Sequence, residues 1–315
     1  MNQVGTVYGN STIQRTFDSI LHFFLKPASP KPLAIFRIAF SFILIAQAFS
    51  MRESILSFLS NHGLVQQDVV NMLSDPFLPK LNGLMNRASQ FGISESGYLH
   101  AFSMAYMLSL FCLLLGIFTN LAALLTWLLH WTIINTGYSG SYGADMYAHI
   151  FLFYLVWVPS GASYSLDRVF RRVSDAPSSR ARLGLRAMQL HLCISYLASG
   201  LEKGTGIQWW NGEAIWMALN LPEYCPFDMH WLANFPFVAM VVGWATLAVE
   251  TLYCIFVWHR KTRLLWVLAT CGLHVSIAIL LSLPIFSLIM CVATLACFGI
   301  SAKGATPRQA EGSPA

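Results

Sequence analysis

Long apolar stretches separated by short polar segments dominate the chain from residue 33 to residue 300. A helix needs about 20 residues to cross the roughly 30 Å hydrocarbon core of a bilayer. Most of the stretches come near that length, although the third, fourth and eighth are short. They predict eight transmembrane helices, at residues 33–50, 98–118, 121–136, 145–158, 185–202, 235–258, 264–283 and 285–300. The predicted fold class is therefore all-α, a polytopic membrane helix bundle.

The segments outside these spans complete the predicted organisation. Residues 1–32 are expected to form an N-terminal tail and a helix on the membrane surface. Apolar residues recur there at helical spacing: Ile13, Phe17, Ile20, Leu21 and Phe24. Residues 33–300 form the transmembrane domain, with long outward-facing connections at 51–97 and 203–234, and short surface helices are expected in the first. Residues 301–315 are rich in Gly, Ala and Pro and are expected to be a disordered tail.

Composition and charge agree with a membrane protein. Of the 315 residues, 56% are hydrophobic and 10% are charged, whereas soluble domains carry about a quarter charged residues. With the N-terminus in the cytoplasm, the predicted topology puts fifteen of the nineteen Lys and Arg residues on the cytoplasmic side. This positive-inside bias predicts that both termini are cytoplasmic. It also accounts for the net charge of +5 without a nucleic-acid partner. The predicted location is a bacterial inner membrane.

Ionisable side chains within the spans are the first candidates for function. Each costs about 2.5–3.5 kcal/mol at the centre of a membrane helix, so each needs a partner or a role. Arg37 and Glu250 both fall in the cytoplasmic half of their spans and carry opposite charges. They are predicted to form a structural ion pair, which is costly to break by removing one partner.

A second group of ionisable residues falls in the outer half or near the middle of the spans. Asp145 and His149 are four residues apart and share a helix face, and His274 lies near the middle of the seventh span. Lys203 lies at the outer end of the fifth span, and all four can converge on an outward-opening cavity. A poorly solvated lysine is a base or a nucleophile in its neutral form, and histidine can relay a proton. Alternatively, Lys203 extends to the membrane interface or pairs with Asp145.

The fifth span carries a stripe of small and polar residues on one face. Steps of four and three residues separate its members: Gln189, Cys193, Tyr196, Gly200 and Lys203. Tyr196, with Trp209 and Trp210 beyond the span, is a candidate site for a flat apolar ligand such as a quinone. The two tryptophans can equally belong to an interfacial aromatic belt. No HExxH, HxxxH or CxxC pattern occurs, so no metal site is predicted.

The order of several segments resembles the HTTM (horizontally transferred transmembrane) family, which includes vitamin K-dependent gamma-carboxylase. These segments are PLAIFRIAFSFILI, GADMYAHIFLFYLVWVPSGASYSLD, QLHLCISYLASGLEKGTGIQWWNG and GLHVSIAILLSLPIFSLIM. The resemblance implies an active-site lysine at Lys203, working with reduced vitamin K and oxygen on the outer side. It also matches His274 to a family histidine. The sequence departs from the family pattern at Asp145, which aligns with a histidine of the family. His149 could take the place of that histidine only if it lies one turn deeper in the helix.

Two functions follow from these observations. One is a membrane-embedded, carboxylase-like lyase with Lys203 as base, assisted by His274 and by Asp145 or His149, and with a reduced, vitamin K-like quinone as cofactor. The other is a non-catalytic membrane scaffold, or a maturation or export partner for a small secreted peptide or protein, working with a membrane or periplasmic partner protein. A transporter is less favoured, because the two halves show no inverted repeat. A cavity lined by Lys203, Asp145 and His274 would favour the enzyme.

Overall fold

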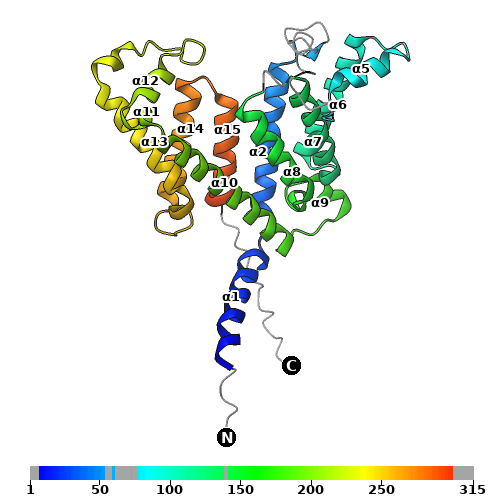
Figure 1. The fold of residues 1–315 in the computed structure, drawn as a ribbon. Coiled ribbons are helices and arrows are strands. Elements are labelled where there is room, and N and C mark those ends of the chain that lie inside the picture. Colours follow the sequence, from blue (N-terminus) through cyan, green and yellow to red (C-terminus); the bar gives the residue numbers. More distant parts are fainter. Residues whose placement is uncertain (1–6, 54–58, 61–71, 73–76, 138–140, 301–315) are drawn as a thin grey trace.

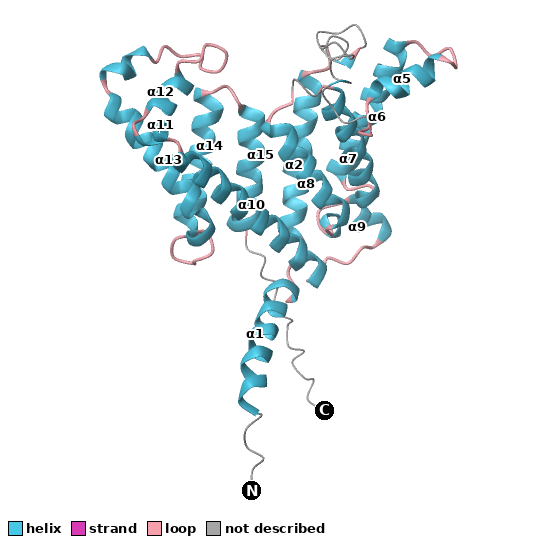
Figure 2. Ribbon diagram, in the orientation of Figure 1, coloured by secondary structure: helices cyan, strands magenta, loops and turns pink. Residues whose placement is uncertain are grey.

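The computed structural model describes residues 7–53, 59–60, 72, 77–137 and 141–300, with side chains described from residue 14 onward. The described chain is helical and contains no strand, which confirms the all-α prediction (Figure 2). The tail at 301–315, predicted to be disordered, lies outside the described residues.

Each of the eight predicted spans has a helix in the structure. These helices are α2 (Lys31–Ser50), α6 (Glu95–Leu115), α7 (Thr119–Thr136), α8 (Gly143–Trp157), α10 (Ser179–Thr205), α13 (Pro236–Phe256), α14 (Arg263–Leu280) and α15 (Pro284–Thr294). The last continues as the π-helical turn η4 (Leu295–Gly299). By length and apolar composition, α2, α6, α13 and α14 can each cross a membrane. The total of eight crossings and the sidedness of the termini stay predictions.

Local sequence signals explain where several of these helices begin and end. The Ser94 hydroxyl accepts a hydrogen bond from the Gly97 backbone amide at the start of α6, and Ser178 caps α10 in the same way. Serine is a preferred residue at this position, because it pairs an amide that the helix leaves free. Proline occupies the first turn of α2, α13 and α15, where its missing amide is not needed.

The helices form two groups joined by α10 and α15 (Figure 1). One group contains α2, α6, α7 and α8, and the other contains α13, α14 and the short helices α11 (Ile207–Trp210) and α12 (Glu213–Leu219). Helix α10 runs obliquely across the bundle and packs mainly on α13, while α15 contacts α14, α2 and α8. The Phe36, Phe40 and Phe151 rings fill the core between α2 and α8.

Two buried charged residues fix the turn between α6 and α7. Arg37 is fully buried, and its guanidinium donates to the carbonyls of Leu113 (2.6 Å) and Leu114 (2.9 Å) at the end of α6 and of Tyr164 (2.6 Å). On the other side of the turn, the carboxylate of Asp167, in α9 (Leu166–Arg171), accepts from the Thr119 backbone amide at 2.7 Å. The Arg37 cation lies at the last carbonyls of α6, and the Asp167 anion lies at the first amides of α7. The helix dipole stabilises each of these charges.

The N-terminal helix extends beyond the bundle, and its place on the membrane surface stays a prediction. Helix α1 (Val7–Leu25) points away from the bundle rather than lying across its end (Figure 1). Its last turn is the anchored part, because the Arg186 guanidinium lies 4.0 Å from the centre of the Phe23 ring and donates to the Phe23 carbonyl. In the first long connection, α5 (Leu81–Ser89) is one of the short helices expected there.

Candidate functional site

Lys203 forms an ion pair with Glu250 between α10 and α13. Its ammonium nitrogen Nζ lies 2.8 Å from Oε2 and 3.1 Å from Oε1 of Glu250, and it also donates to the Ser199 hydroxyl. The Glu250 side chain is 9% exposed, whereas that of Lys203 is 24% exposed. The pair is therefore buried on the carboxylate side and accessible on the amine side.

Close contact between α10 and α13 sets the position of this pair. A Cβ atom on Gly200 would lie 2.5 Å from Oγ1 and 2.7 Å from the backbone nitrogen of Thr251, so only glycine permits this approach. Small residues at helix interfaces commonly allow such proximity in membrane proteins. One turn from Glu250, the Tyr196 and Tyr253 rings pack with their centroids 4.4 Å apart. The polar stripe of α10 thus faces α13 rather than lipid.

His274 joins the same stripe through Tyr196. Its Nε2 atom lies 2.7 Å from the Tyr196 hydroxyl, so this hydrogen bond connects α14 to α10. The His274 ring is buried and lies 5.4 Å, centre to centre, from the Phe286 ring of α15. Its Nδ1 atom is buried and has no hydrogen-bond partner among the described residues. His274 is therefore held at one nitrogen and has an open position at the other.

The predicted ion pair between Arg37 and Glu250 is wrong. Glu250 pairs with Lys203, and Arg37 instead binds backbone carbonyls at the end of α6. Depth counted along each span put Lys203 at the outer edge and Glu250 in the inner half. That count treats all helices as parallel, whereas α10 extends to Thr205 and runs obliquely, which brings Lys203 to the level of Glu250.

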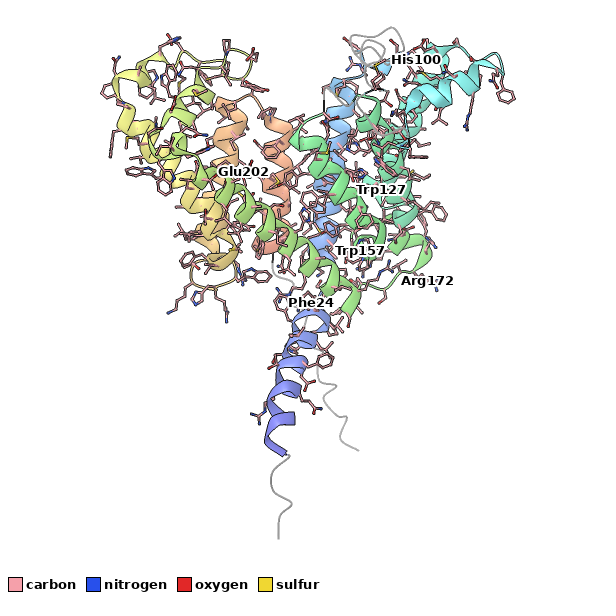
Figure 3. The ribbon with its side chains drawn as sticks, viewed as in Figure 1. Phe24, His100, Trp127, Trp157, Arg172 and Glu202 are labelled. Atoms are coloured by element: carbon pink, nitrogen blue, oxygen red, sulfur yellow. The ribbon has the colours of Figure 1, made fainter. Side chains whose placement is uncertain are left out.

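Asp145 and His149 lie in the other helix group, so the expected cavity shared with Lys203 and His274 is also wrong. The Asp145 carboxylate accepts from Gln47 Nε2 at 3.1 Å and from the Tyr142 backbone amide at 3.1 Å. The His149 ring stacks on Trp127 with centroids 5.2 Å apart. Figure 3 places Trp127 in this group and Glu202, the neighbour of Lys203 in the sequence, on α10 across the bundle.

Asp145 and His149 stay apart from Lys203 and His274 because the beginning of α8 does not pack against α10. Helix α10 meets α8 through Tyr154 and His191, whose hydroxyl and Nδ1 atoms lie 3.3 Å apart. Tyr154 lies near the end of α8, far from Asp145 in its first turn. The beginning of α8 instead contacts α7 and α2. Helical spacing correctly put Asp145 and His149 on one helix, but it could not identify the neighbours of that helix.

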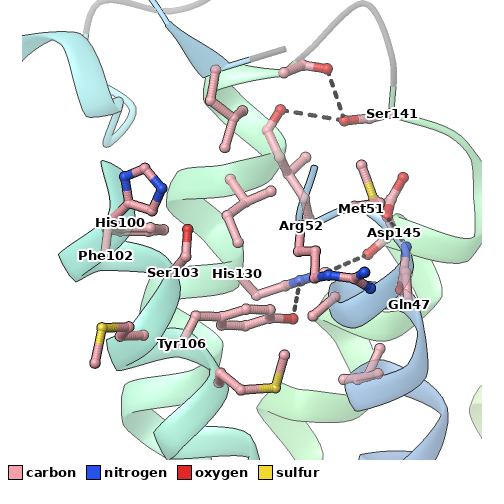
Figure 4. Close-up of a pocket in the computed structure, with 18 residues that line it drawn as sticks. Gln47, Met51, Arg52, His100, Phe102, Ser103, Tyr106, His130, Ser141 and Asp145 are labelled. Carbon is pink, nitrogen blue, oxygen red and sulfur yellow. Dashed lines mark hydrogen bonds between the residues drawn. The ribbon is translucent and has the colours of Figure 1, made fainter. Parts of the chain in front are cut away.

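The structure contains a cavity of about 350 Å³ where α2 and α7 end and α6 and α8 begin (Figure 4). Asp145 lines it, but Lys203 and His274 do not. Its polar side includes Tyr106 and His130, which were not predicted to have a role: the Tyr106 hydroxyl lies 3.0 Å from His130 Nδ1. The one available sequence signal was that His130 is an ionisable residue within a predicted span, which costs free energy unless it is paired.

The three aromatic candidates for a quinone site do not form one surface. The Trp209 ring lies beside Lys203, with the amine nitrogen 5.4 Å from the ring centre. Trp210 is exposed, and its indole nitrogen donates to the Gly204 carbonyl at 2.9 Å. Tyr196 is buried against Tyr253 and offers no free ring face to the same side. Trp209 is therefore the aromatic candidate that lies beside Lys203, and Tyr196 does not fit the role.

These features define an all-helical membrane protein with a lysine–glutamate pair between α10 and α13, and comparison with known proteins names its family. The HTTM domain matches residues 88–301, more than half of the chain. The protein belongs to the HTTM family, whose domain is found in vitamin K-dependent carboxylase-like proteins. Neither a curated protein nor a solved structure matches the chain.

Proposed function

We propose that the protein is a membrane-embedded, carboxylase-like enzyme in which Lys203 acts as the base. One observation carries this proposal: Glu250 holds Lys203 by both carboxylate oxygens, yet the lysine keeps an accessible side. Membership of the HTTM family supports it, since that domain occurs in vitamin K-dependent carboxylase-like proteins.

The pair itself provides a route to the neutral amine that a base requires. In the resting ion pair the proton is on Lys203, and the carboxylate of Glu250 lies 2.8 Å away. Transfer of that proton to Glu250 would leave a neutral amine beside a neutral acid, and neither group then needs a charged partner. The amine then takes a proton from the substrate on its accessible side. Tyr196 and His274 are positioned to hold the α10 stripe in place.

A reduced, vitamin K-like quinone is the proposed cofactor, with Trp209 as the residue that would hold its ring beside Lys203. Such a cofactor supplies the reducing equivalents and the acidic hydroxyl group on which a lysine base can act. The chain's own contribution is to orient the amine through Glu250 and Ser199. Trp210 is an interfacial residue in this proposal. The site faces outward from a bacterial inner membrane, as the positive-inside pattern predicts.

The test compares Lys203→Arg and Lys203→Ala with the wild type and with Lys261→Arg, a matched change at an exposed residue. Arginine keeps the charge of the pair but does not give up its proton at ordinary pH. The measurements are folded yield in membranes and oxygen-dependent oxidation of a reduced naphthoquinone. Lys203→Arg is expected to fold like the wild type and to lose turnover. If Lys203→Arg retains turnover, or if the folded wild type has none, the proposal is refuted.

A membrane scaffold or maturation partner is the second candidate function. The observation in its favour is the separation of Asp145 and His149 from Lys203, which leaves Glu250 as the charged partner of the lysine. In that case Lys203 and Glu250 join α10 to α13, and a secreted peptide or a periplasmic partner protein binds elsewhere. The same variants distinguish this function: Lys203→Ala loses folded protein, Lys203→Arg behaves as wild type, and neither changes quinol oxidation.

A further inference from the structure

The cavity between α2, α6, α7 and α8 has the size and composition of a small-molecule site. Its volume of about 350 Å³ lies in the range of ligand pockets, which are mostly apolar with a few placed polar groups. The apolar lining includes Leu44, Met51, Phe102, Met107 and Ile133. This cavity does not include Lys203, so an inference about it stands independently of the proposed catalytic role.

The hydrogen bonds along the polar side fix which groups donate. His130 Nε2 lies 3.2 Å from the Asp145 backbone carbonyl, which can only accept, so Nε2 carries the proton. In a neutral imidazole Nδ1 is then an acceptor, and the Tyr106 hydroxyl must donate to it across 3.0 Å. The Tyr106 oxygen is left without a proton to offer but with lone pairs free. It can therefore accept a hydrogen bond from a ligand in the cavity.

The neighbouring polar groups are also acceptors. The Ser103 hydroxyl donates to the Leu99 carbonyl at 2.7 Å, which leaves its oxygen as an acceptor on the cavity side. Gln47 donates one amide hydrogen to the Asp145 carboxylate and keeps its carbonyl oxygen as a further acceptor. A ligand that pairs with Tyr106 and Ser103 must bring a hydrogen-bond donor.

The neutral groups at Tyr106 and Ser103 favour an uncharged ligand. A charge placed beside them would lose its hydration in a mostly apolar cavity and would meet only neutral hydrogen-bond acceptors. A hydroxyl group supplies the needed donor without a charge.

The cavity reaches the apolar perimeter of the bundle along α6. Four residues form an exposed apolar stripe on that helix: Met104, Leu108, Phe111 and Leu115. They recur at steps of four, three and four, so they share one face. Met104, which is 73% exposed, also lines the cavity. A ligand that dissolves in the bilayer can therefore enter beside Met104 without crossing water.

We propose that this cavity binds an uncharged, single-chain amphiphile with a hydroxyl headgroup, taken up from the membrane. The chain packs among the apolar side chains of α2, α6 and α7. The hydroxyl donates to the Tyr106 oxygen at the end of the Tyr106–His130–Asp145 hydrogen-bond series (Figure 4).

The test uses full-length protein in lipid nanodiscs, because detergents with sugar headgroups would compete for the site. A photoreactive dodecanol is the probe, and mass spectrometry maps the labelled residues. Unlabelled dodecanol, dodecylamine and dodecanoate are the competitors. Saturable labelling at the cavity, displaced by dodecanol and not by the charged amphiphiles, is the expected result. Equal displacement by dodecylamine or dodecanoate overturns the uncharged class, and no saturable labelling overturns the site.

Three variants distinguish specific binding from solubility in the surrounding lipid. Tyr106→Phe removes the accepting oxygen and is expected to weaken dodecanol binding about fivefold, the size of one neutral hydrogen bond. Ser103→Trp fills the cavity and is expected to abolish labelling. Leu108→Trp adds the same bulk on the exposed stripe of α6 and is expected to leave labelling unchanged. If the two tryptophan variants label alike, or if Tyr106→Phe binds as the wild type does, the proposal is wrong.

Discussion

The contact between Gly200 and Thr251 makes a quantitative prediction about how the Lys203 site is held together. Gly200→Ala would place a methyl group 2.5 Å from Oγ1 and 2.7 Å from the backbone nitrogen of Thr251. Rotation of the Thr251 side chain can relieve the first clash but not the second. Helices α10 and α13 must therefore separate, and overpacking of this kind costs about 1–3 kcal/mol.

Gly204 provides a matched control one turn along the same helix. A Cβ atom at this position would meet nothing within 4 Å. Alanine gains up to about 1 kcal/mol of helix propensity over glycine, and this gain is largest in the helix interior, where Gly200 lies. A lower stability of Gly200→Ala than of Gly204→Ala therefore reports the steric cost at Gly200. Gly200→Ala is expected to be less stable than Gly204→Ala by about 1–3 kcal/mol.

The assay is reversible unfolding of the two variants and the wild type in mixed detergent and lipid, followed by helix content and by tryptophan fluorescence. Adding Thr251→Ala to Gly200→Ala is expected to recover little stability, because the backbone contact persists. Equal stability of Gly200→Ala and Gly204→Ala would refute the close approach of α10 and α13. Full recovery by Thr251→Ala would show that the side chain, and not the backbone, limits the approach.

Three further predictions concern the buried charges. Arg37→Met leaves buried carbonyls at the end of α6 without their donor, at about 1–3 kcal/mol for each one left unpaired, and is expected to lower folded yield in membranes. Burial alone would raise the pKa of Asp167, but hydrogen bonds from Thr119 and from the Phe118 backbone amide, together with the nearby charge of Arg171, lower this pKa below its ordinary value. The ionised Asp167 carboxylate contributes its full stability above the unfolded pKa of about 3.9. That contribution is lost as the pH falls through the lower folded pKa. Asp167→Asn should therefore make the unfolding free energy depend less on pH in the acid range. Lys203→Gln leaves the Glu250 carboxylate, the more buried partner of the pair, without its cation, and it is expected to lose more stability than Glu250→Gln in the same unfolding assay, because the lysine left by Glu250→Gln is the more exposed charge.

The bundle separates the Lys203 site from the cavity that Tyr106 and His130 line. Lys203, Glu250, Tyr196 and His274 lie where α10 meets α13 and α14. The cavity with Tyr106 and His130 lies among α2, α6, α7 and α8. Helix α15 packs between these groups and contacts α14, α2 and α8. Each region can therefore be altered by substitution without touching the side chains of the other, which allows the two proposals to be tested separately.

Hydrophobic pattern predicted the helices themselves because bilayer thickness and helical rise constrain length and composition together. It located the eight helices that correspond to the predicted spans, the polar stripe of α10 and a lysine within that stripe. Family resemblance added the HTTM assignment, which the matching domain bears out. Periodicity can say which residues share a face of one helix, since that face depends only on the 3.6-residue turn.

Tertiary structure decided which faces meet. The oblique course of α10 brings Lys203 to Glu250, and Gly200 allows the approach, so the partner of Glu250 is not Arg37. The packing of α8 on α7 carries Asp145 away to a separate cavity. The tilt of a helix and the helices it packs against depend on side-chain packing between segments that are distant in the sequence. Such packing produces no periodic pattern in the sequence. The sequence alone therefore determined the helices and their polar residues, and the packing determined which of those residues form a site.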